Sequence, residues 1–363
     1  MSAAQTPAVA PPVEARSTET SLLRRIWRSY AFRRVGKALL TIYLVATFTF
    51  FLVRLLPGNP VEVFINTQMQ RSGMSYDQAA NMAKGLYSFD PGKPLLVQYF
   101  QYLAGLVHGD LGYSVASPGT TVGSILVSFL PWTLFSVGLA LIISFCAGIL
   151  LGMAMAYFRG GVLDHVLSIL GSLLHSIPNY LLAIMIVVFL GIQLNLFDVS
   201  RMRGAYSPGV TPEFSADFFS DAMYHAGLPI TTYVLTTIGS WMLIMKSSTV
   251  ETLGEDYVTV ARARGLRDRR IATAYVGRNA VLPLFSQLAI AAGFVVGGSI
   301  LIEQVFQYQG IGYLLFKAVN DRDYPLMQGI FLVITIAVVL ANLFADLLYG
   351  RLDPRIRLGG GDR

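Results

Sequence analysis

The stretch LPWTLFSVGLALIISFCAGILLGMAMAYF, residues Leu130 to Phe158, contains no Asp, Glu, Lys or Arg. About 20 apolar helical residues cross the roughly 30 Å of hydrocarbon in a bilayer. The whole chain agrees with such a setting, because apolar residues make up 54% of its 363 residues and charged residues only 13%. That charged share is about half the share typical of soluble domains. The sequence therefore predicts an integral membrane protein and excludes a soluble enzyme, a secreted scaffold and a disordered protein.

Six stretches are apolar and long enough to cross a membrane, which predicts an all-α membrane protein with six transmembrane helices. The second and third are too long for a straight crossing, so we expect tilt or an interfacial turn. The third carries Pro178 in mid-run, where a backbone hydrogen bond is lost and a kink is expected. The six stretches are Gly36 to Leu56, Leu130 to Phe158, Val162 to Leu196, Leu228 to Met245, Pro283 to Phe306 and Leu326 to Tyr349.

The distribution of cations predicts the orientation of these helices. Most of the 27 Lys and Arg fall on one side of the membrane if both termini are cytoplasmic, and cytoplasmic loops carry the excess of Lys and Arg. We therefore expect both the N-terminus and the C-terminus inside.

This orientation divides the chain into segments. We expect a disordered cytoplasmic tail with a basic pre-membrane segment at 1–35, the first transmembrane helix at 36–56, a periplasmic or extracellular region at 57–124, a five-helix core at 125–350 and a cytoplasmic tail at 351–363. Short helices are expected at Tyr76 to Leu86 and Leu95 to Val107. Arg201 to Gly227, rich in Gly, Pro, Asp and Phe, is expected to be an outside surface loop.

The longest inside connection, residues 251–283, reads ETLGEDYVTVARARGLRDRRIATAYVGRNAVLP. Gly254 and Gly265 bracket a helical pattern with acidic residues in its first turn and arginines in its last, which suits the helix dipole. Gly265 fits the left-handed conformation that ends such a helix. So short a helix is marginal alone, so we expect it to dock on something. On charge alone, a solvated basic loop remains an equal alternative.

The order of residues in this loop resembles the EAA loop of ABC-importer permeases, with Gly265 as its glycine and Leu282 and Pro283 as its closing pair. Thr259 stands where that family has Glu, and the gap between Gly265 and Pro283 is longer than in sugar-type permeases. Both departures are similar to the peptide-permease branch. The triplet itself consists of Thr259, Val260 and Ala261.

Four more motifs resemble the B-type dipeptide and oligopeptide permeases, although Gln309 replaces a usual Pro and Asn59 a usual Asp. The motifs are RLLPGNP at 54–60, HGDLGYS at 108–114, the segment Gly297 to Gly329, and LYGRLDPRIR at 348–357.

The resemblance implies the type I ABC-importer permease fold in a bacterial or archaeal cytoplasmic membrane. It implies a second homologous permease subunit, two cytoplasmic ATPase subunits that hold ATP and Mg, and an extracytoplasmic substrate-binding protein. The sequence has no phosphate-binding loop of its own, so we expect a non-enzymatic transport subunit that contacts lipid but binds no cofactor, metal or nucleic acid. For ATPase coupling we expect Glu255, Asp256, Tyr257, Ala261, Arg264, Gly265 and Leu266.

Polar groups inside a membrane are costly and therefore informative. For the translocation path or a gate we expect Asn179, Gln287 and Glu303, with Glu303 near the outer mouth and either acting as a gate or paired with Arg322 or Lys317. A plain interfacial carboxylate reached by water is the alternative for Glu303. For docking of the binding protein we expect Tyr308, Gly310, Gly312, Arg322 and Asp323.

Other functions remain open at this point. The same kind of importer carrying oligosaccharides or another small solute fits the sequence nearly as well as a peptide importer. A self-sufficient channel or ion-coupled carrier would show interrupted spans and inverted repeats, which we do not expect here. A single cysteine, Cys146, excludes a disulfide framework, and no Ser–His or His-Glu-x-x-His arrangement lies in the predicted spans.

Overall fold

The computed structural model describes residues 30–55, 60–86, 93–297 and 300–352. The expected tails therefore lie largely outside the described residues, as does the centre of the RLLPGNP motif. Within these ranges the regular structure is helical, apart from one isolated bridge between Tyr113 and Thr121. The predicted all-α fold is confirmed.

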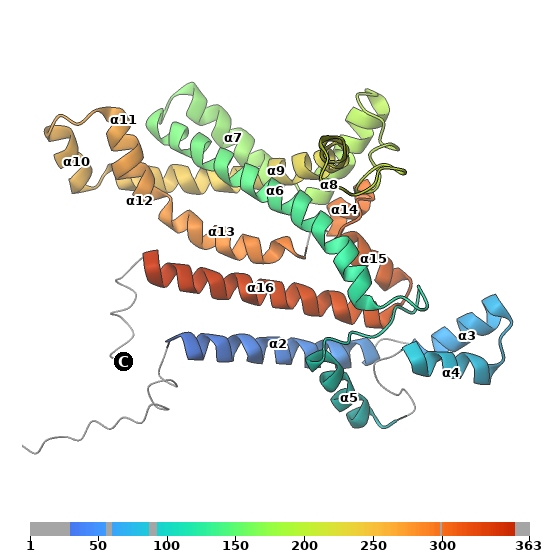
Figure 1. Ribbon diagram of the computed structural model, residues 1–363. Helices are drawn as coiled ribbons and strands as arrows, with labels where there is room; N and C mark the ends of the chain where they lie inside the picture. The colour runs from blue at the N-terminus through green and yellow to red at the C-terminus, as the bar shows by residue number, and fades with distance from the viewer. Residues whose placement is uncertain (1–29, 56–59, 87–92, 298–299, 353–363) are drawn as a thin grey trace, which may run out of the picture.

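Four helices are long and apolar enough to cross a membrane, and two bent helix pairs bring this number to six if each pair forms one span. Figure 1 shows α16 lying beside α2, and α6 crossing α9. The four helices are α2 (Tyr30–Leu55), α6 (Val122–Tyr157), α9 (Ala216–Leu253) and α16 (Tyr324–Leu352).

The third apolar stretch is broken, not merely kinked. It forms α7 (Val162–Ser176) and then α8 (Asn179–Met185) with the π-helix η1 (Ile186–Gln193), and the two parts meet at 99°. Ile177, which precedes Pro178, is extended with ψ 124°, because the proline ring excludes the helical conformation at the residue before it. The expectation that no span is interrupted was therefore wrong.

Helix α9 begins at Ala216, well before the expected start of the fourth span. The side chain of Ser215 accepts a hydrogen bond from the amide of Phe218 at 3.2 Å and caps the helix. The predicted surface loop, Arg201 to Gly227, therefore ends at this cap, and its remaining residues belong to α9.

The region 60–121 holds three short helices near the end of α2 that Figure 1 shows at the right. They are α3 (Pro60–Ser72), α4 (Tyr76–Leu86) and α5 (Leu95–Val107). The last two have the predicted bounds. Towards the C-terminus, the fifth apolar stretch divides into α13 (Leu282–Val295) and α14 (Ile300–Phe306), and α15 (Ile311–Asn320) leads into α16.

Glycines let α9 approach its two neighbours closely. A Cβ on Gly148 or Gly152 of α6 would collide with Trp241, Met242 or Met245 of α9. Gly239 of α9 meets Gly171 of α7 backbone to backbone. Such small-residue contacts hold helices together in lipid, where the hydrophobic effect between helices is absent.

We predict that Gly239→Ala destabilises the protein, because the added Cβ would lie 2.9 Å from the carbonyl carbon of Gly171 and force α7 and α9 apart. Overpacking of this kind costs about 1–3 kcal/mol, which thermal unfolding of the detergent-solubilised protein should register as a lower midpoint. Gly123→Ala is the control, because this α6 position has no atom within 4 Å of an added Cβ. Equal midpoints for both variants would contradict the packing.

Candidate functional site

Residues 251–283, which we call the inner loop because the predicted orientation places them inside, consist of a short helix held on a base formed by the same loop. Helix α10 (Asp256–Ala263) follows α9 directly and is followed by α11 (Asp268–Arg270), the π-helix η2 (Ile271–Gly277) and α12 (Arg278–Ala280). Figure 1 places this group at the end of α9 that lies opposite α14 and the loop before α9.

The predicted end of this helix is confirmed. Gly265 has φ +71°, its amide donates to the carbonyl of Arg262 at 2.9 Å, and the amide of Leu266 donates to the carbonyl of Ala261 at 3.3 Å. This pair of bonds is the Schellman arrangement, which satisfies the last carbonyls of a helix.

One face of α10 packs against its own loop. Val258 and Ala261 are 0% and 2% exposed and form a buried cluster with Ile271 and Val276. Direct contact of Ala261 with an ATPase, as its place among the expected coupling residues implied, is therefore wrong, because its side chain faces inward. Leu266 is half-buried beside the same cluster.

The opposite face of α10 is exposed. Its outward ridge consists of Thr259, Val260 and Ala263, and Ala263 takes the place we expected for Ala261. Tyr257 is exposed at the side, where its hydroxyl accepts a hydrogen bond of 3.1 Å from Asn279. The remaining expected coupling residues, Glu255, Asp256, Arg264 and Gly265, are also exposed.

A basic groove lies next to α10. Its volume is about 540 Å³, and it is lined by Gly265, Leu266, Arg267, Arg269, Arg270 and Thr273. Within the described ranges no ion pair neutralises these three arginines. The loop thus presents an uncharged ridge beside a positively charged surface.

At the other end of the molecule, Glu303 of α14 is buried and hydrogen bonded. It is 1% exposed, and its carboxylate accepts bonds of 3.0 Å from the hydroxyl of Thr133 and from the amide of Tyr313. The expected pairing with Arg322 or Lys317 is therefore wrong, and so is the water-reached alternative, whereas the gate role of Glu303 stays a prediction.

Two glycines make room for the Glu303 side chain. A Cβ on Gly310 would overlap the carboxylate, and a Cβ on Gly312 would come within 2.6 Å of the Cα of Ile300. The turn between α14 and α15 therefore wraps directly around the buried carboxylate.

Asp323, between α15 and α16, is the second buried carboxylate at this end, with 0% exposure. It accepts hydrogen bonds from the hydroxyl of Ser114, from the amide of Ala116 at 3.1 Å and from the amide of Leu326 at 3.2 Å. It thereby fastens the loop after α5 to the start of α16. We call Glu303, Asp323 and their hydrogen-bond donors the outer polar cluster, after the side on which the predicted orientation places them.

The residues expected to dock a binding protein lie mostly inside. Tyr308, Gly310, Gly312 and Asp323 are buried, because they build the outer polar cluster and its surroundings, so a surface contact role for them is wrong. Arg322 alone among the five is exposed.

The other two expected path residues occupy separate elements. Asn179 is half-buried at the start of α8, and Gln287 is exposed on α13. Glu303 is fully enclosed and reaches no open surface, and the path role of Asn179 and Gln287 stays a prediction.

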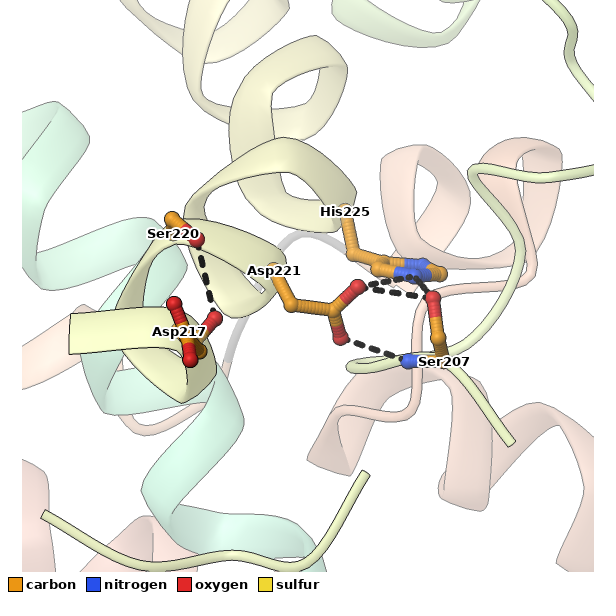
Figure 2. A network of polar contacts seen from close by, with 5 residues as sticks. All are labelled: Ser207, Asp217, Ser220, Asp221 and His225. Atoms are coloured by element: carbon orange, nitrogen blue, oxygen red, sulfur yellow. Dashed lines mark hydrogen bonds and ion pairs between the residues drawn. The ribbon is translucent and has the colours of Figure 1, made fainter. Parts of the chain in front are cut away.

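Sequence reasoning missed a third polar group at this end, which Figure 2 shows. The hydroxyl and the amide of Ser207 donate to the two carboxylate oxygens of Asp221, each at 2.7 Å. Nε2 of His225 lies 3.1 Å from the Ser207 hydroxyl and 3.8 Å from Asp221. In a catalytic triad the histidine uses one nitrogen for each partner, whereas here Nδ1 is buried without a hydrogen bond. The group fastens the loop before α9 to that helix.

Among the described residues, no group of three or more His, Cys, Asp or Glu side chains is placed to hold a metal ion.

Comparison with known proteins places the chain among transporters. Residues 148–358 match the family model described as binding-protein-dependent transport system inner membrane component. A provisionally named peptide permease protein of Brucella suis biovar 1 is 33% identical over 329 residues, which cover 91% of this chain and 99% of its own. The dipeptide transport system permease proteins of Escherichia coli K12 and Bacillus subtilis 168 are 31% and 30% identical, with 90% and 91% of this chain covered and 98% of each of theirs.

We predict that Asp323→Ala loosens the loop after α5, because the hydroxyl of Ser114 and two amides lose their buried acceptor. Each unsatisfied buried donor costs about 1–3 kcal/mol. Limited proteolysis of the purified protein should therefore cut near Gly119 faster than in the unsubstituted protein. The matched control is Asp321→Ala, since Asp321 is exposed; equal cutting of the two variants would contradict the role of Asp323.

Proposed function

The chain belongs to the family of binding-protein-dependent transport system inner membrane components, and from that premise we propose that it forms part of the path by which di- or oligopeptides enter the cell. Membership in this family makes it a permease subunit of an ABC importer, a multi-pass protein of the cytoplasmic membrane and not an enzyme. It also implies ATPase and binding-protein partners. The peptide cargo is supported by the names of the relatives over nearly their whole length.

Its assembly follows the same proposal. Two ATPase subunits bind ATP and Mg on the cytoplasmic side, a second homologous permease subunit completes the path, and an extracytoplasmic binding protein delivers the substrate. Six crossings with both termini inside put the arginine-rich inner loop next to the ATPases.

The observation that carries the coupling role is the exposed ridge of α10 on its packed base. Val260 is 55% exposed although it is apolar, while Val258, two residues away, is completely buried. A ridge of this kind fits a groove on a partner protein. The basic groove beside it gives that partner a charged rim to recognise.

Helix α9 carries the motion of α10 through the membrane. Its 38 residues span about 57 Å at 1.5 Å per residue, from the inner loop to the outer end. Asp164 of α7 forms an ion pair with Lys246 of α9 and accepts a hydrogen bond from the backbone amide of Gly160. Helices α6, α7 and α9 should therefore move as one body when ATP closes the ATPases.

We predict that Val260→Glu uncouples the importer, because a carboxylate replaces an apolar contact on the ridge. Peptide uptake and substrate-stimulated ATP hydrolysis in reconstituted vesicles should fall at least about tenfold, as expected for the loss of a buried interface contact. Membrane insertion and copurification of the second permease should persist.

The control is Val162→Glu, the same change at a position that is 80% exposed at the start of α7. An acidic residue in the first turn of a helix is well tolerated, so uptake should remain. Normal uptake by Val260→Glu, or a chain that transports with no ATPase attached, would end the assignment of this ridge.

The cargo is tested by uptake into vesicles that contain the complete importer and its binding protein. We predict that a labelled dipeptide accumulates in an ATP-dependent manner and that a labelled oligosaccharide does not. Accumulation of the oligosaccharide instead would replace the peptide by the second candidate cargo.

A further inference from the structure

A cavity of about 510 Å³ is lined by residues near the N-terminal ends of α6 and α9, and the inner loop follows the C-terminal end of α9. This volume is within the range of small-molecule sites. Its lining is mainly aromatic and contains one charged side chain. The residues that matter are Trp132, Phe135, Tyr206, Phe218, Phe219 and Glu213.

Three rings from separate elements form one wall of the cavity. The ring centroids of Tyr206 and Trp132 are 5.3 Å apart, and the ring centroid of Phe218 is 6.0 Å from each of them. Trp132 and Tyr206 also pack against the buried cluster that contains Tyr308. The side of these rings that faces away from the cavity is therefore packed against the protein interior.

The Ser207–Asp221–His225 group keeps this wall in place. Ser207 follows Tyr206 directly, and Asp221 precedes Ala222, another residue of the lining. The hydrogen bonds of Figure 2 thus fix the loop with its tyrosine to the helix with its phenylalanines. A pre-formed pocket loses less free energy on binding than one that must be ordered.

The cavity opens to water. Pro212, Glu213 and Phe214 at its rim are outside any helix, and irregular backbone does not face lipid within the hydrocarbon. Phe214 is fully exposed, with its ring 6.1 Å from that of Phe219. A solute arriving from the aqueous phase on that side meets this rim first.

Aromatic faces attract organic cations, and a carboxylate adds a direct charge partner. A lipid acyl chain would need neither the aromatic faces nor the carboxylate, so the lining favours a cationic organic solute over a lipid. We propose that this pocket binds the amino-terminal end of a peptide, with its α-ammonium group at Glu213 and its first side chain against the wall formed by the rings of Trp132, Tyr206 and Phe218. This inference rests on the proposed peptide cargo and adds a contact between that cargo and this subunit.

The test measures binding to the assembled permease pair with its ATPases, without the binding protein. The probe is phenylalanyl-alanine, titrated by saturation-transfer NMR, and its matched partner is N-acetyl-phenylalanyl-alanine, which lacks the ammonium group. We expect saturable millimolar binding of the free peptide, about two- to fivefold weaker binding after acetylation, and a similar loss in Glu213→Gln, as fits one exposed charge pair.

Glu62→Gln is the control, since Glu62 is an exposed acid on α3 and its loss should leave the affinity unchanged. Acetylation and Glu213→Gln should not weaken binding additively, because both remove the same charge pair. Trp132→Leu should weaken binding of both peptides and keep the preference for the free amine.

Three results would overturn the pocket: no saturable binding of phenylalanyl-alanine, equal affinity in Glu213→Gln, or a bound lipid that Trp132→Leu releases without any change in peptide binding. Uptake by the complete importer separates this failure from failure of the proposed function. Dipeptide uptake without binding at the pocket rejects the pocket alone, whereas no uptake of any peptide rejects the proposed cargo.

Discussion

The close contact of α9 with α6 and α7 is the constraint on which the rest of the molecule depends. In lipid no hydrophobic effect drives helices together, so their association requires close approach. This close approach occurs where Gly239 meets Gly171, and where Gly148 and Gly152 meet the region of α9 around Trp241. Because α9 bears the inner loop at one end and the aromatic pocket at the other, these contacts make one long rigid element out of three helices. A force or a ligand at one end then acts on the same body as at the other.

Buried carboxylates fix the outer end in a different way. A buried charged or polar group is tolerated only with hydrogen-bond partners, and Glu303 and Asp323 each find theirs on distant elements. The motif HGDLGYS therefore contacts the segment around Asp323 directly, since the hydroxyl of Ser114 donates a hydrogen bond to the carboxylate of Asp323. Residues that suggested a docking surface in the sequence instead hold the outer turns in shape, and a partner would meet the exposed side chains around them, such as Arg322.

The sequence predicts what depends on local pattern. Apolar length predicted the long helices, the short helices at Tyr76 and Leu95 came out with their bounds, and glycine chemistry predicted the left-handed end at Gly265. It could not predict which face of α10 turns inward, because spacing groups Val260 with Ala261 but does not say what covers them. Nor could it predict the partners of Glu303, since Thr133 lies 170 residues away. At Pro178 the sequence predicted only a kink. The full break arises because Ile177 adopts an extended conformation, which the sequence alone did not reveal.

The orientation of α10 also decides where its motion goes. An eight-residue helix is too short to be stable alone, so its conformation depends on the cluster of Val258, Ala261, Ile271 and Val276. That cluster joins α10 to η2, and η2 continues through α12 into α13. Ser248 of α9 also donates to the carbonyl of Ala280 at 2.7 Å, so the base of the loop is bonded to α9 a second time. If α10 has the coupling role proposed above, a push on its outward ridge reaches α9 and α13 together, and the two helices respond as a pair.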